Sequence, residues 1–218
     1  MPPKPKVTRE EVAQKALEII RNDGIEALTA RDLGKSLGTS ARPIFTVFNG
    51  MEDVKEAARE LALTEFVEYI SDYQNYTPAF KKIGMMLILY GIREPELFKL
   101  LFMQEHKDIN DVAGSLKDLG GIELVCVELI QKDYETTKEQ AVFLLEQMWA
   151  TAYGLGVMCA MKVCSFTEEE IGNRLGVTFS GLLMLVKSGK LPDIYADVKK
   201  NEDGEFHGIK VSNPSFLP

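Results

Sequence analysis

Histidine is nearly absent from the 218-residue chain, which holds only His106 and His207. The two lie far apart in the sequence, and neither belongs to a plausible cysteine, serine or carboxylate motif. The chain also lacks a glycine-rich phosphate-binding loop and the paired cysteines of a metal site. The sequence therefore predicts a protein that is not an enzyme and that needs neither a cofactor nor a metal.

Cysteines and long apolar runs are also scarce. Cys126, Cys159 and Cys164 are an odd number without paired spacing, which predicts three buried thiols in a reducing cytoplasm. No apolar run approaches the roughly 20 residues that span a membrane. The basic, proline-rich residues 1–6 have no apolar segment behind them that would make a secretory signal. We therefore expect a cytoplasmic protein without a membrane partner.

Charge is distributed unevenly along the chain. The net charge of −8 argues against a protein that coats nucleic acid with its whole surface. Residues 1–50, however, hold eight Lys and Arg against six Asp and Glu, whereas the remaining 168 residues hold 17 against 27. This asymmetry predicts a small N-terminal segment that faces a polyanion and a larger, acidic segment with another task.

The sequence predicts helices between residues 8 and 188, separated by glycine and proline. Apolar residues recur at three- and four-residue spacing, and no β-hairpin pattern occurs before residue 200. Capping boxes at Thr8–Glu11 and Thr167–Glu170 predict two helix starts. Helices are expected at 8–22, after Thr29, at 39–47, and at 52–72, 78–92, 95–106, 121–132, 138–162 and 167–188. The predicted fold is all-α, with a domain at 1–50, a larger helical domain at 51–190 and a C-terminal extension at 191–218.

Residues 28–48 have the layout of a helix-turn-helix. Two short helices flank the Gly38-Thr39-Ser40 turn. The residues that can pack inward on the first helix are Ala30, Leu33, Leu37, Ile44 and Phe48. This leaves the polar side of the second helix of the pair for the major groove, where Arg42 can make two hydrogen bonds with guanine. An alternative stays open at this point, because three short amphipathic helices also occur in domains that bind no DNA, and hydroxyls at helix starts are often only caps.

The order of motifs over residues 8–60 resembles the DNA-binding domain of the TetR (tetracycline-repressor) family. The matching features are Asp23-Gly24, Ala27-Leu28-Thr29, Arg31-Asp32-Leu33, Leu37-Gly38-Thr39-Ser40, Phe45 with Phe48, and Glu52-Asp53. The resemblance implies a DNA-binding surface formed by Thr29, Arg31, Thr39, Ser40, Arg42, Phe45 and Thr46. Two departures weaken non-specific affinity: Phe45 replaces the usual tyrosine, and Met51 replaces a lysine that meets the DNA backbone.

The larger domain is rich in methionine and aromatic residues at helical spacing. Such side chains often line a cavity for an apolar small molecule, although a plain core is the alternative for any one of them. Residues 89–102, and Trp149 followed by Tyr153-Gly154, resemble a Trp-His-Gly subgroup of TetR regulatory domains, with tyrosine in place of histidine. The predicted ligand-binding residues are Met86, Leu89, Tyr90, Phe102, Met103, His106, Met148, Trp149 and Tyr153.

The segments 138–162 and 167–188 are predicted to form a homodimer. The second segment carries an apolar face with three glycines that permit close approach, and Leu175, Phe179, Leu182 and Leu183 are the predicted interface residues. Packing within one chain is the alternative. A dimer is favoured because two recognition helices read two half-sites of a pseudo-palindrome.

Together these features predict a sequence-specific transcriptional regulator. The expected partners are double-stranded operator DNA, a small-molecule effector and a second copy of the chain. We expect a repressor that a small apolar or aromatic effector releases from its operator. The alternative is a helical protein-interaction adaptor with a degenerate helix-turn-helix.

Overall fold

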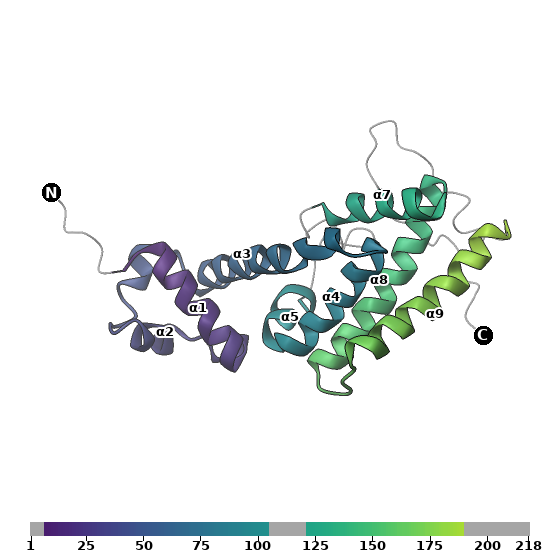
Figure 1. The fold of residues 1–218 in the computed structure, drawn as a ribbon. Coiled ribbons are helices and arrows are strands. Elements are labelled where there is room, and N and C mark those ends of the chain that lie inside the picture. The colour runs from purple at the N-terminus through teal and green to yellow at the C-terminus, as the bar shows by residue number, and fades with distance from the viewer. Residues whose placement is uncertain (1–6, 105–120, 190–218) are drawn as a thin grey trace, which may run out of the picture. The chain divides into compact units, whose positions relative to one another are not determined.

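The computed structural model describes residues 7–104 and 121–189, and every regular element in these ranges is helical (Figure 1). The predicted all-α fold is thereby confirmed for the described part of the chain. The α-helices are α1 (Arg9–Asp23), α2 (Ala30–Ser36), α3 (Met51–Ile70), α4 (Ala79–Arg93), α5 (Pro95–Phe102), α7 (Ile122–Tyr134), α8 (Lys138–Ala160) and α9 (Glu168–Lys187). Three short 3₁₀ helices, η1 (Ile25–Ala27), η2 (Ile44–Thr46) and η3 (Ser71–Asn75), lie between them.

Both predicted capping boxes are present at the atomic level. The Thr8 hydroxyl accepts a hydrogen bond from the Glu11 N–H at 3.1 Å, and the Glu11 carboxylate accepts one from the Thr8 N–H at 2.8 Å. Thr167 and Glu170 exchange the same two bonds at 3.2 and 2.8 Å. Each pair satisfies backbone donors that a helix start leaves free, which explains why α1 and α9 begin where the sequence predicts.

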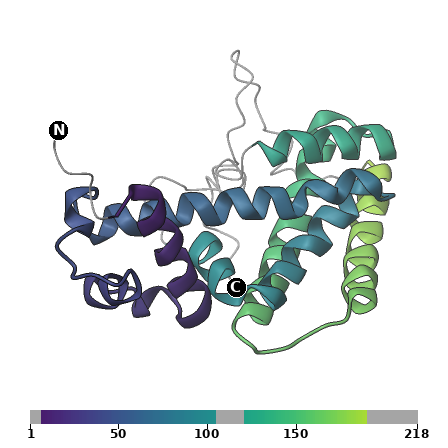
Figure 2. The same ribbon diagram turned by 60° about the vertical axis from the view of Figure 1, so that its left-hand side comes forward.

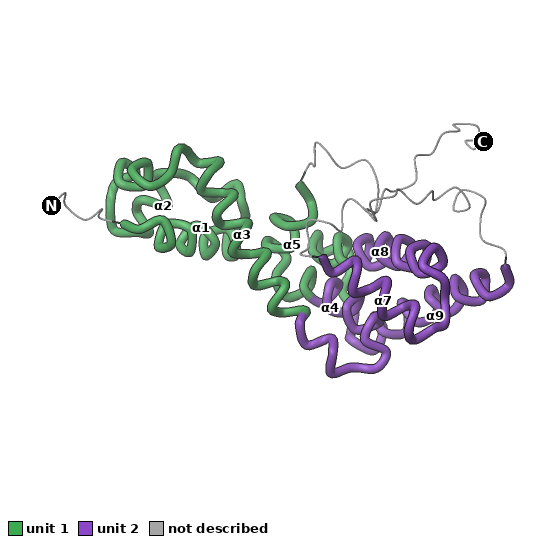
Figure 3. The backbone as a smooth tube through the Cα atoms, turned by 90° about the horizontal axis from the view of Figure 1, so that it is seen from above, with its two compact units in different colours: residues 1–70, 90–104, 156–165 green, residues 71–89, 105–155, 166–218 purple. Residues whose placement is uncertain are grey.

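The helices form two compact units (Figure 3). Unit 1 comprises residues 1–70, 90–104 and 156–165, and unit 2 comprises residues 71–89, 105–155 and 166–218. The domain limits expected at residues 50 and 190 rest on sequence punctuation and stay a prediction. The extension at 191–218 lies outside the described residues.

In unit 1, helix α1 packs against both α3 and α5 (Figure 2). Leu17 and Ile20 of α1, Phe66 of α3 and Phe98 of α5 are all fully buried or nearly so. Arg21, in the last turn of α1, forms ion pairs with Glu65 of α3 and, at 3.2 Å, with Glu94, which precedes α5. The apolar core and these ion pairs join the N-terminal helix to α3 and α5, and the ion-paired residues are 44 and 73 positions apart in the sequence.

In unit 2, aromatic and small residues pack α4, α7, α8 and α9 together. The Phe179 ring of α9 lies 5.7 Å from the Phe80 ring of α4 and 4.7 Å from the Tyr134 ring of α7, measured between centroids. Gly84 lets α4 approach its neighbours, since a Cβ there would lie 3.3 Å from Leu175 of α9. Aromatic burial of this kind is a large stabilising contribution to a helical core.

Helix α8 is long and apolar, although the sequence predicts no membrane span. Among the described helices it is the one that is long and apolar enough to cross a membrane, by length and composition. Half of its apolar window is, however, buried against other parts of the chain, and Glu146 in its middle is buried as well. These features are typical of a core helix, and a single such helix is weak support for a membrane segment.

Candidate functional site

The first part of the site is the N-terminal helical head, residues 7–50. Leu33 of α2 and Ile44 of η2 are completely buried, and Phe48 is 4% exposed. These three residues face inward as predicted, while Ala30 and Leu37 are only half-buried. Because this core fixes α2 and the segment after it, the polar residues between the core positions must face outward.

The segment at 39–47 differs from the α-helix that the sequence predicts. It forms bends and turns followed by η2, with i→i−3 hydrogen bonds from Ile44 N–H to Ala41 O at 3.2 Å and from Thr46 N–H to Pro43 O at 3.1 Å. Two physical causes account for the tighter turn. The segment is too short to offset the cost of nucleating an α-helix. In addition, Pro43 has no N–H to donate to residue 39.

Gly34 brings α2 against this turn. A Cβ at Gly34 would lie 2.9 Å from the Ala41 nitrogen and 2.9 Å from the Ser40 carbonyl carbon. The Thr39 N–H also donates to the Gly34 carbonyl oxygen at 2.9 Å. Only glycine permits this approach without displacement of the backbone. Sequence reasoning did not find this role, because it depends on a contact and not on the helical pattern.

The predicted DNA-binding residues lie at the surface of the head. Six of the seven are exposed, namely Thr29, Arg31, Ser40, Arg42, Phe45 and Thr46, and Thr39 is half-buried. Two of the hydroxyls already have local partners. Thr29 caps α2 through Asp32, and the Thr46 hydroxyl donates to Pro43 O at 2.6 Å. These two hydroxyls therefore have a structural role whether or not they also meet phosphate.

Three cations of the head are free to meet an anion. Arg31, Lys35 and Arg42 are exposed, and none forms an ion pair with a residue in the described ranges 7–104 and 121–189. Lys35, one turn after Arg31 on α2, was not among the predicted contacts, although its spacing places it on the same helix face. Unpaired Arg and Lys side chains are the groups that proteins use to bind phosphates.

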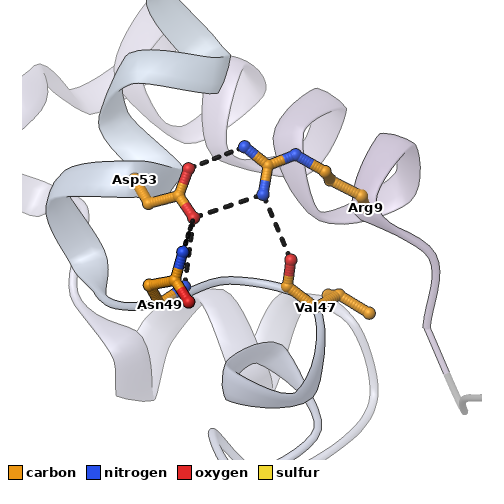
Figure 4. Close-up of polar contacts among 4 residues, drawn as sticks. All are labelled: Arg9, Val47, Asn49 and Asp53. Carbon is orange, nitrogen blue, oxygen red and sulfur yellow. Dashed lines mark hydrogen bonds and ion pairs between the residues drawn. The ribbon is translucent and has the colours of Figure 1, made fainter.

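Arg9 holds the end of this segment in place (Figure 4). Its guanidinium donates to both Asp53 carboxylate oxygens, at 2.6 and 3.2 Å, and to Val47 O at 3.1 Å. It also lies 4.1 Å from the centroid of the Phe48 ring. The Arg9 hydrogen bonds, followed by the Asn49 N–H, lower the pKa of Asp53 to about 2. A cation in the first turn of a helix is electrostatically unfavourable, and this anomaly at Arg9 was the available clue to its partner.

The predicted ligand-binding residues divide between the two units. In unit 1, the Phe66 ring of α3 lies 5.0 Å from the Tyr90 ring and 5.1 Å from the Phe102 ring, both edge-on. Met103 is exposed, and His106 lies outside the described residues. In unit 2, Met86, Leu89 and Met148 are buried, whereas Trp149 and Tyr153 are half-buried with ring centroids 6.2 Å apart.

Tyr90 has a feature that the sequence could not reveal. It is 4% exposed, yet its hydroxyl has no hydrogen-bond partner among the residues that the structure describes. Burial first, and then the nearby Glu94 and Glu65 carboxylates, raise the pKa of Tyr90 above its ordinary value, so the hydroxyl is a protonated donor. A buried donor without an acceptor costs free energy, which a bound acceptor would recover.

The predicted dimer residues lie at different depths in unit 2. Leu175 is 2% exposed and packs near Gly84, so its side chain is already covered within its own chain. Leu182, Leu183 and Phe179 are half-buried. The sequence pattern missed the most exposed apolar residues of α9, Val177 at 77% and Met184 at 73%. Val177 and Met184 are seven positions apart, which is about two turns of an α-helix, so they lie on one face of α9.

The three cysteines correct one expectation. Cys126 and Cys159 are buried as predicted, whereas Cys164 is only half-buried. Cys164 follows the end of α8 and lies in the connection to α9, where side chains are more accessible than inside a helix bundle.

Comparison with known proteins gives a fold relationship. The chain is similar to the structure of a TetR family transcription regulator from Marinobacter aquaeolei VT8, with a TM-score of 0.54 and 14% sequence identity over 79% of this chain and 93% of that one. It is also similar to the fatty acid degradation regulator FadR from Bacillus halodurans, with a TM-score of 0.51 and 16% identity over 84% of this chain and 97% of that one. No family model and no curated protein matches the sequence. At these identities the similarity shows a shared all-α fold.

Proposed function

We propose that this chain is a homodimeric transcriptional regulator that binds operator DNA through its N-terminal head. The observation that carries the proposal is the exposed surface formed by Arg31, Lys35 and Arg42, whose charges have no ion-pair partner in the described part of the chain. Arg31 and Lys35 stand on α2 and Arg42 on the turn that follows it, in a chain with a net charge of −8. The fold shared with two regulators supports this interpretation.

Selection of bound duplexes from a random pool tests the proposal directly. We expect an enriched inverted repeat, because a two-fold dimer reads two equivalent half-sites. On the enriched duplex, Arg42→Ala is expected to lower affinity by roughly 5- to 150-fold, since one bidentate arginine–guanine contact contributes about 1–3 kcal/mol. Arg174→Ala is the matched control, because it removes the same charge from α9 of unit 2. Selection without enrichment, or equal affinities for both variants, would contradict DNA reading and favour the protein-interaction adaptor.

The proposed homodimer uses the outer faces of α8 and α9. Val177 and Met184 are the exposed apolar residues of α9, with Gly181 between them, where a Cβ would meet nothing within 4 Å. Ala150 is exposed and Gly154 half-buried on α8, and a Cβ at Gly154 would also be in open space. Small residues between larger apolar ones let two helices approach closely, as a two-fold interface requires. Leu182 and Leu183 would border this interface, with Leu175 and Phe179 supporting it from inside.

Light scattering on a sizing column tests the dimer. Val177→Asp is expected to shift the chain to a monomer, because it places a charge in the centre of an apolar interface. Leu124→Asp is the matched control, since Leu124 of α7 is also an exposed apolar residue, at 56%. A wild-type chain that elutes as a monomer at all concentrations would refute the interface.

We further propose that the regulator is a repressor and that its effector is a small apolar or aromatic molecule. The support comes from unit 1, where Phe66 of α3 contacts both Tyr90 and Phe102, two of the predicted ligand-binding residues. The other end of α3 carries Asp53, which is bound to Arg9 of the head. A ligand that changes the packing around Phe66 therefore acts on the helix that supports the DNA-binding segment. Such a ligand lowers DNA affinity only by as much as it prefers the form that does not bind DNA.

A thermal-shift screen of small aromatic and aliphatic compounds tests the effector. A compound that raises the midpoint of unfolding is then added at saturation to the protein–duplex complex, and we expect the complex to dissociate. Tyr90→Phe is expected to weaken the binding of a compound that accepts the Tyr90 hydrogen bond, while Tyr76→Phe, at an exposed tyrosine, serves as its control. A saturating compound that leaves duplex affinity unchanged would refute the effector mechanism while leaving DNA binding intact.

A further inference from the structure

The end of α8 brings two cysteines together. Lys162 has a positive φ of 58°, and the chain reverses there through hydrogen bonds from Lys162 N–H to Cys159 O and from Val163 N–H to Met158 O, both 2.9 Å. This pair of bonds is the Schellman arrangement that ends many helices. The turn carries Cys164 back toward the last turn of α8, close enough for its thiol to raise the pKa of Cys159.

The two sulfurs are unequal in accessibility. Cys159 is 5% exposed, whereas Cys164 is half-buried and reachable by a small reagent. Burial first, and then the neighbouring Cys164, raise the pKa of Cys159 to about 11, so Cys159 is a protonated thiol at neutral pH. An accessible thiol next to a covered one is the arrangement of an attacking and a resolving cysteine. Nothing in the DNA-binding, effector-binding or dimer surfaces proposed above uses this pair.

We propose that Cys159 and Cys164 are a redox-active dithiol that forms an intramolecular disulfide with small-molecule disulfides. The Cys164 thiolate attacks one sulfur of the reagent, so that a mixed disulfide forms and one thiol leaves. The Cys159 sulfur then loses its proton and attacks the Cys164 sulfur, which releases the second thiol. The two protein thiols are oxidised and the reagent is reduced to two thiols. The product bond joins the last turn of α8 to the connection that leads to α9.

Oxidised glutathione and the full-length chain suffice for the test. Lys162 lies between the two cysteines, so trypsin separates them into peptides 139–162 and 163–174, which only a disulfide can hold together. After treatment with the reagent, alkylation of free thiols and digestion, we expect the two peptides to be recovered as one linked species. The intact chain is expected to be lighter by about 2 Da and to regain that mass after reduction with dithiothreitol.

Three variants make the result specific. Cys126→Ala is the matched control and should form the same bond, because burial raises the pKa of the lone Cys126 to about 12 and removes it from the reaction. Cys159→Ala should stop at a glutathione adduct on Cys164, and Cys164→Ala should not react. Circular dichroism of each variant establishes that it is folded. A glutathione adduct that persists on Cys164 of the wild-type chain, a bond that involves Cys126, or a disulfide between two chains would overturn the proposal.

Discussion

Replacing Gly34 with alanine adds one methyl group at the point where α2 meets the turn before η2. In an ordinary helix interior this change stabilises the helix by about 1 kcal/mol. At Gly34, however, the new Cβ would lie 2.9 Å from two backbone atoms of residues 40 and 41, closer than real Cβ contacts. Backbone cannot swing away as a flexible side chain can, so the turn has to shift. Forced packing of this kind costs about 1–3 kcal/mol.

For Gly34→Ala the cost of the forced contact outweighs the gain in helix propensity. We expect a net loss of up to about 2 kcal/mol in the free energy of unfolding, measured by urea denaturation. Duplex affinity should fall by about tenfold or more, because the displaced turn carries Arg42 and a misplaced arginine forfeits much of its contact with the base. Fluorescence anisotropy with the selected duplex measures this second effect.

Gly176→Ala is the control that separates helix propensity from the close approach. Gly176 also lies inside a helix, α9, but its new Cβ would be 3.6 Å from the flexible Lys81 ammonium, an ordinary contact. We therefore expect Gly176→Ala to stabilise the chain by up to about 1 kcal/mol. If Gly34→Ala stabilises the chain equally and leaves duplex affinity unchanged, the account of the turn is wrong.

Three further predictions concern stability. Arg9 and a neighbouring backbone N–H lower the pKa of Asp53 from 3.8 to about 2. The charged carboxylate therefore stabilises the head above pH 4, and this contribution is lost as the pH falls from 3.8 toward 2. Asp53→Asn should remove that part of the acid dependence, as measured by urea midpoints between pH 2 and pH 4. In Gly91→Ala the new Cβ would lie 2.7 Å from the Gly156 carbonyl oxygen, so α4 and α8 must separate there; thermal unfolding should show a loss of about 1–3 kcal/mol, and an unchanged midpoint would refute the close approach. Arg21→Met keeps the aliphatic stem but removes ion pairs with two half-exposed carboxylates; the loss should stay below about 1 kcal/mol and shrink in 1 M salt, whereas a loss that persists there would indicate packing.

Local sequence patterns predicted the helices well. The Thr8 and Thr167 capping boxes placed the starts of α1 and α9, and the helix expected at 95–106 begins at Pro95 as α5. The inward positions Leu33, Ile44 and Phe48 followed from three- and four-residue spacing. The error at 39–47 has the same origin, because apolar spacing does not distinguish a short α-helix from a 3₁₀ turn.

The sequence by itself determined the helix starts, the inward faces and the outward polar side of the head, because these depend on residues within about four positions of one another. Tertiary structure alone decided that Gly34 meets the turn at Ser40 and that Arg9 binds Asp53. It also decided that the Tyr90 hydroxyl is buried without an acceptor among the described residues. Arg9 and Asp53 are 44 residues apart, and no local pattern connects them. Such contacts form only when packed helices bring distant segments together, and their geometry depends on the whole core at once.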